Sequence, residues 1–112
     1  MVEESVWSPF EHGSTLQTSG SAGGVIVRDE VYPGARMTLE ECTQPPYAIV
    51  CDFAGLFHTA YAHTLAEAEA RFEEMQVEIV RMLGLVAHDD DPDQAEKQAQ
   101  LDAAFDAFTL QF

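Results

Sequence analysis

The chain has 112 residues, 46% of them apolar, which suffices for one domain with a hydrophobic core. Twenty acidic residues against five Lys and Arg give a formal net charge of -15, which repels phosphate backbones and anionic membranes. The chain has no apolar run long enough for a transmembrane helix, and its acidic N-terminus does not resemble a signal peptide. We therefore expect a cytoplasmic protein that binds neither nucleic acid nor membrane. Its surface either attracts a basic partner or simply keeps the protein soluble.

Residues 1–12 are expected to form an irregular N-terminal arm. Its Trp7 and Phe10 rings either pack onto the body of the protein or line a pocket rim beside His12. Residues 14–18 suit a short strand. The glycine-rich run at 19–24 is followed by a strand pattern and not by the lysine of a phosphate-binding loop, so a hairpin connection is the better interpretation.

Four later segments have the alternating or apolar pattern of strands, and Pro and Gly separate them: Val25–Tyr32, Arg36–Cys42, Tyr47–Phe53 and Phe57–His63. Between the first two, the apolar pattern favours a turn of odd length at Pro33 and Gly34, which places Arg28 opposite Glu40. The third segment is apolar on both faces except at Asp52, which is typical of a central strand.

The turn after this central strand is either Ala54-Gly55 or Ala54-Gly55-Leu56. The two lengths give opposite faces to His58 and Thr59, and the sequence does not decide between them.

The segment from Thr64 to Gly84 has the features of a long helix. Thr64 and Glu67 match a capping box, and Gly84 suits a left-handed residue that ends the helix. The apolar residues recur with helical spacing, at Leu65, Phe72, Met75, Ile79, Met82 and Leu83.

Residues 85–93 are expected to be an acidic linker, and residues 94–112 an amphipathic helix. The linker aspartates could attract calcium, but they lack the ligand spacing of an EF-hand loop: Asp89, Asp90, Asp91 and Asp93. Asp91 with Pro92 is instead a suitable helix start. The final helix carries an apolar stripe at Leu101, Ala104, Phe105, Phe108 and Phe112.

Cys42 and Cys51 lie too far apart on neighbouring strands for a disulfide, and buried, unreactive thiols are expected. In one register His58 faces Cys51, as a nucleophile and its base would. Asp52 and His63 lie nearby, but no oxyanion hole is recognisable, so an enzyme using Cys51 and His58 is a remote alternative. No cofactor or metal site is predicted.

Two consecutive runs, Gly23–Glu30 and Tyr32–Glu40, resemble a stretch found in small uncharacterised bacterial α+β proteins. The resemblance extends over residues 13 to 83 and implies no activity.

Together these patterns predict an α+β domain. An antiparallel meander of four to five strands carries a long helix on one face and is followed by a second, C-terminal helix. The sheet and the long helix form the core at 13–84. Because one helix covers one face only, the last helix or a partner must cover the other, and a homodimer is expected.

The favoured function is a non-enzymatic protein-interaction or dimerisation module whose partner is itself or a basic protein. The expected interface residues are Leu101, Phe105, Phe108 and Phe112. The alternative is a small-ligand-binding domain with a pocket between the sheet and the helices, lined by Phe53, Phe57, Tyr61 and Phe105.

Overall fold

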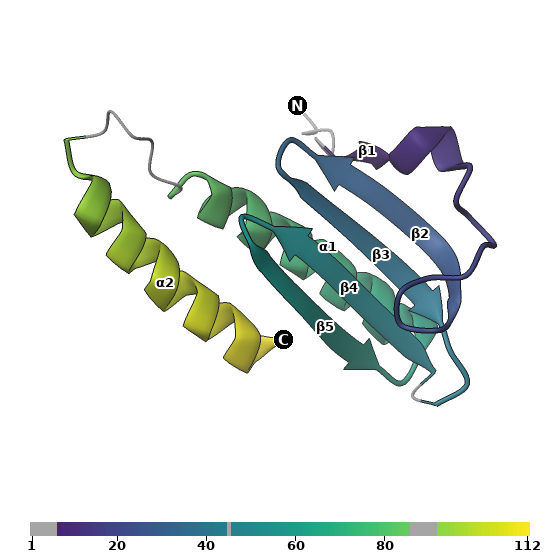
Figure 1. The fold of residues 1–112 in the computed structure, drawn as a ribbon. Coiled ribbons are helices and arrows are strands. Elements are labelled where there is room, and N and C mark those ends of the chain that lie inside the picture. The colour runs from purple at the N-terminus through teal and green to yellow at the C-terminus, as the bar shows by residue number, and fades with distance from the viewer. Residues whose placement is uncertain (1–6, 45, 86–91) are drawn as a thin grey trace, which may run out of the picture.

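The computed structural model describes residues 7–44, 46–85 and 92–112 (Figure 1). Five strands form one antiparallel sheet in which spatial order equals chain order. The elements are β1 (Ser8–Pro9), a 3₁₀ turn (Phe10–Gly13), β2 (Val25–Tyr32), β3 (Ala35–Glu41), β4 (Tyr47–Phe53), β5 (Leu56–Ala62), α1 (Leu65–Leu83) and α2 (Gln94–Gln111). The predicted α+β class, with its antiparallel meander, long helix and second C-terminal helix, is confirmed.

The long helix α1 begins as the sequence predicts. The Thr64 hydroxyl accepts a hydrogen bond from the Glu67 amide at 3.1 Å, which satisfies one of the free amides of the first turn. Four residues of the predicted stripe are buried against the sheet together with Ala68: Phe72, Met75, Ile79 and Met82. Leu65, which the spacing placed on the same stripe, is 46% exposed at the first turn. The end of the helix differs from the prediction, because Gly84 has a φ of -69° and lies in the right-handed region.

The predicted pairing of β2 with β3 is wrong. The turn contains only Pro33 and Gly34, and Arg28 lies opposite Leu39 instead of Glu40. A β-bulge between Ile26 and Arg28 adds one residue to β2, so the apolar alternation shifts by one position along the strand.

The bulge turns two charged residues of β2 toward α1, where each has a partner. The Arg28 guanidinium lies 4.2 Å from the centroid of the Phe72 ring. Glu30 accepts a hydrogen bond from the Gln76 amide at 2.8 Å. Polar contacts on α1 therefore compensate for a register that the apolar pattern alone does not favour.

The turn between β4 and β5 is the two-residue alternative. Ala54 and Gly55 both have positive φ, 50° and 86°, as the tight turn of a twisted hairpin requires. Phe53 therefore pairs with Leu56, and Cys51 with His58. This register places Phe57 on the face of the sheet opposite Phe53.

Helix α2 lies beside β5 and joins α1 on the same face of the sheet (Figure 1). The Phe53 ring lies 5.7 Å from Phe105 and 5.6 Å from Phe108, between ring centroids, and His58 lies 5.8 Å from Phe108. The predicted stripe of α2 is thus the face that packs, with Leu101 and Phe108 buried. Helix α2 extends the helical layer, and neither helix covers the other face of the sheet.

The N-terminal arm is described from Trp7 onward. Trp7 is buried, with its ring 5.6 Å from Tyr32. Residues 14–18 form turns, and the short strand of this region is β1, which pairs with the end of β2. The aspartates of the expected acidic linker at positions 89 to 91, and with them the predicted helix cap at Asp91, lie outside the described residues.

Candidate functional site

The face of the sheet turned away from both helices is called the open face. It carries Ile26, Asp29 and Val31 of β2, Arg36, Thr38 and Glu40 of β3, Ala48, Val50 and Asp52 of β4, and Phe57, Thr59 and Tyr61 of β5. At the β2 side, the segment from Phe10 to Gly24 lies over this face. Toward β5, large side chains remain exposed.

The glycine-rich run binds an anion, and that anion is the chain's own Glu40. The Glu40 side chain is fully buried, and its carboxylate accepts hydrogen bonds from the Ala22 and Gly24 amides, each at 3.1 Å. A Cβ at Gly20 would overlap the Glu40 carboxylate in its present position, so glycine lets the loop approach this carboxylate closely. Ser19 pairs antiparallel with Val25, which confirms the predicted hairpin connection.

A second polar cluster lies beside this loop. Arg36 donates two hydrogen bonds to the buried Asp29 carboxylate, at 3.0 and 2.6 Å, and Thr15 donates a third at 2.7 Å. The Phe10 ring lies 3.7 Å from the guanidinium carbon of Arg36. The hydrogen bonds that Arg36 donates to Asp29 raise the pKa of Arg36 above its ordinary value. The charge of Arg36 is therefore balanced within the chain.

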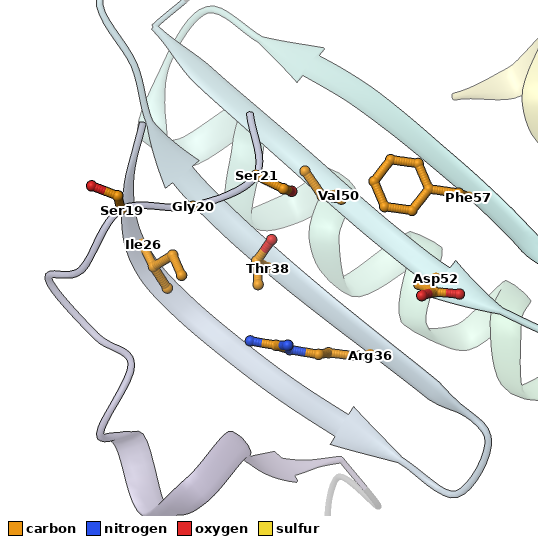
Figure 2. A pocket seen from close by; sticks show the side chains of 9 residues that line it. All are labelled: Ser19, Gly20, Ser21, Ile26, Arg36, Thr38, Val50, Asp52 and Phe57. Atoms are coloured by element: carbon orange, nitrogen blue, oxygen red, sulfur yellow. The ribbon is translucent and has the colours of Figure 1, made fainter. Parts of the chain in front are cut away.

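Between the glycine-rich loop and β5, the open face contains a hollow of about 240 Å³ (Figure 2). Its lining comes from the loop and from four strands: Ser19, Gly20, Ser21, Ile26, Arg36, Thr38, Val50, Asp52 and Phe57. Ile26 and Val50 are buried and form an apolar floor, and Thr38 and Arg36 add hydroxyl and guanidinium groups. The Phe57 ring lies along the β5 side of the hollow (Figure 2).

Asp52 is the exposed carboxylate of this hollow. It pairs across the strands with Arg36 on one side and Phe57 on the other. Among the residues that the structure describes, none forms an ion pair with Asp52. Within the described part of the chain, Asp52 therefore supplies a negative charge that has no paired cation.

Two aromatic side chains stand out from the open face on β5. Phe57 is 62% exposed and Tyr61 is 52% exposed. Strand β5 is the last strand of the sheet, and the Tyr61 carbonyl accepts a hydrogen bond from the Arg71 side chain at 2.7 Å. The N–H and C=O groups of Tyr61 therefore point away from β4. In an antiparallel pair every second residue has this orientation, so the N–H and C=O groups of Thr59 and Phe57 also point away from β4.

Cys51 and His58 lie together on the helix face, away from the hollow. The Cys51 thiol is buried and donates to the His58 carbonyl at 3.5 Å. Burial raises the pKa of Cys51 to about 12, so the thiol stays protonated at neutral pH. Cys42 is also a free thiol, and Cys51 pairs with Met37, five residues away from position 42.

The residues expected to line one ligand pocket are divided between the two faces of the sheet. Phe53 and Phe105 pack together on the helix side, whereas Phe57 and Tyr61 lie on the open face. The expected interface residues are engaged within the chain, since Leu101 and Phe108 are buried and Phe105 and Phe112 pack against the same core.

Of the residues of the hollow, Phe57 was expected to line a ligand pocket, and Asp52 was considered only as a neighbour of Cys51. The other lining residues come from the glycine-rich loop and from β2, β3 and β4, and no periodicity marks them as neighbours. The single available signal was Asp52, the one charged residue in an otherwise apolar central strand.

Within residues 7–44, 46–85 and 92–112, no three His, Cys or acidic side chains gather in a way that could hold a metal ion. No described helix combines the length and apolar character needed to cross a bilayer.

No family model, curated protein or solved structure matches this chain. Its function is therefore inferred from the open face itself.

Proposed function

We propose that this chain is a non-enzymatic interaction module that binds a basic protein through the open face of its sheet. The observation that carries the proposal is the pair of exposed rings, Phe57 and Tyr61, beside the hollow. Aromatic side chains are enriched in protein interfaces because they bury a large area at little entropic cost. Two of them on one strand face, next to a concave surface, suit the centre of an interface.

The charge of the chain favours a basic partner. The strands of the open face carry three carboxylates there, those of Asp29, Glu40 and Asp52, and one guanidinium, that of Arg36. The formal excess is two negative charges. The whole chain adds a long-range field from its net charge of -15, which accelerates association with a cation. The same field opposes the approach of a second copy of the chain, so self-association ranks behind binding of a basic protein.

A non-enzymatic role is supported by the surroundings of the candidate nucleophile. The Cys51 thiol is buried beneath the helices, and Phe108 packs against the ring of His58. Catalysis by a thiol requires an accessible thiolate, which these positions do not favour.

Self-association through the edge of β5 is the second candidate. The outward N–H and C=O groups of Phe57 and Thr59 are available for pairing with another strand. Sedimentation equilibrium tests this candidate with the Thr59→Pro variant, which removes an outward N–H and leaves the β4 ladder in place. A dimer that becomes a monomer in the variant would support it, and a monomeric parent chain would exclude it.

Partner capture from the native host at low salt tests the main proposal. The baits are the full chain, a Phe57→Ser/Tyr61→Ser double variant, and a Val77→Ser control, which removes an exposed apolar residue of α1 (69% exposed). We expect a basic protein that the parent and control capture and the double variant does not. The captured protein is then purified and titrated by calorimetry, where its affinity must fall as salt is added. Equal binding to parent and double variant would contradict the proposal.

A further inference from the structure

We propose that the hollow on the open face receives one long basic side chain, a lysine or an arginine, from the partner protein. Its aliphatic stem lies on Val50 beside the Phe57 ring, and its charged group reaches Asp52. This inference rests on the proposed function and adds the chemistry of the central contact.

The size of the hollow favours a side chain over a separate small molecule. Its volume is about 240 Å³, and sites for small molecules usually span about 300–1,000 Å³. It lies between the glycine-rich loop and Phe57 of β5 (Figure 2), and it is a partly open hollow and not an enclosed cavity, so a side chain of a partner can enter it from the surface.

The charges of the hollow select a cation. Arg36 is engaged by Asp29 through two hydrogen bonds and is stacked on Phe10. Its positive charge is therefore compensated before any ligand arrives. Asp52 has no such partner among the described residues, so a bound ammonium or guanidinium supplies the missing countercharge.

The apolar part of the hollow suits the stem of the same side chain. Val50 is only 6% exposed and Ile26 only 4%, so the floor is closed and apolar. Phe57 and Asp52 lie directly opposite each other on β5 and β4. A cation at the carboxylate is thus close to an aromatic face, where cation–π attraction adds to the ion pair. Lysine and arginine combine such an apolar stem with a charged end.

An NMR titration of the full chain tests this proposal without the partner. The probes are two capped tripeptides that differ only at the central residue, which is lysine in one and the uncharged isostere norleucine in the other. We expect the lysine peptide to shift the amide signals of Ser21, Asp52 and Phe57 and to bind more tightly than the norleucine peptide. Asp52→Asn and Phe57→Leu should each weaken its binding by about two- to fivefold. Glu73→Gln, which removes one exposed carboxylate on α1, is the matched control and should change nothing.

Several results would overturn the proposal. These are equal binding of the two peptides, equal binding by the parent and Asp52→Asn chains, no binding of the lysine peptide, or shifts spread evenly over the acidic surface. The proposed function fails separately, when the Phe57→Ser/Tyr61→Ser variant still captures the basic protein. A partner lost by that double variant but bound normally by Asp52→Asn would keep the interface and reject the side-chain site.

Discussion

The two faces of the sheet are built from the same strands but differ in burial and in charge. On the helix face, Met37, Leu39, Ile49 and Phe53 are at most 1% exposed, and their neighbours on α1 and α2 complete an apolar core. On the open face, some of the alternate residues form an ion pair or accept hydrogen bonds from the glycine-rich loop, others are the buried floor of the hollow, and those of β5 stay largely exposed. Because neighbouring residues of a strand point to opposite sides, a residue of the core and a residue of the proposed interface are separated by a single position in the sequence.

The largest difference should appear when a ring is removed from the helix face. Phe53→Ala deletes a side chain that contacts both Phe105 and Phe108, so it leaves a cavity and loosens α2. We expect the free energy of unfolding to fall by about 3–5 kcal/mol, measured by urea denaturation. A loss no larger than that of an exposed-site substitution would mean that α2 is not part of the core.

Removal of Glu40, one of the two buried acids of the open face, should lower the stability of the fold by an intermediate amount. Glu40→Ala leaves the Ala22 and Gly24 amides without their acceptor, which should lower the free energy of unfolding by about 1–3 kcal/mol. Hydrogen exchange at these two amides should accelerate. The neighbouring Glu41→Ala, at an exposed position, is the control, and equal losses in both variants would contradict the capping role.

The buried thiol of the helix face should make stability depend on pH. Burial raises the pKa of Cys51 from 9.0 to about 12 in the folded protein. Above pH 9.0 the unfolded chain releases this proton and the folded chain keeps it, so stability is lost as the pH rises toward 12. The slope should approach about 1.4 kcal/mol per pH unit. Urea midpoints of the parent chain and Cys51→Ala over this range isolate the effect, and parallel curves would refute it.

The smallest change in stability is expected at the exposed ring of β5. Phe57→Ser should alter the free energy of unfolding by no more than about 0.5 kcal/mol, because the ring is 62% exposed. The same urea experiment measures it beside Phe53→Ala. A loss comparable to that of Phe53→Ala would show that the open face also carries the core.

Local signals in the sequence were sufficient for the main elements. The Thr64 and Glu67 pair marked the start of α1, and the apolar runs marked β2 to β5. The register of β2 on β3 was missed, because the bulge at Val27 has no signature of its own. The side chains that contact Arg28 and Glu30 in this register are Phe72 and Gln76. They lie on α1, more than 40 residues along the chain, and only the folded structure brings them together.

The position of α2 and the hollow depended on choices that the sequence left open. The face on which His58 lies follows from one residue more or less in the turn at Ala54 and Gly55. Once that turn is short, His58 and Phe53 form the surface that receives Phe108. The glycine-rich loop was interpreted correctly as a connection, but its acceptor Glu40 lies on another strand and no local pattern links them.

The order of the strands has a consequence for how the protein folds. Every strand of the sheet pairs with the strand that precedes it in the chain, from β1 to β5. From β3 to β5, each new strand closes only a short loop, whereas residues 10–24 separate β1 from β2. Local pairing of this kind lowers the contact order, which is associated with rapid folding. The sheet can grow hairpin by hairpin during synthesis, and α1 and then α2 arrive when their docking surface already exists.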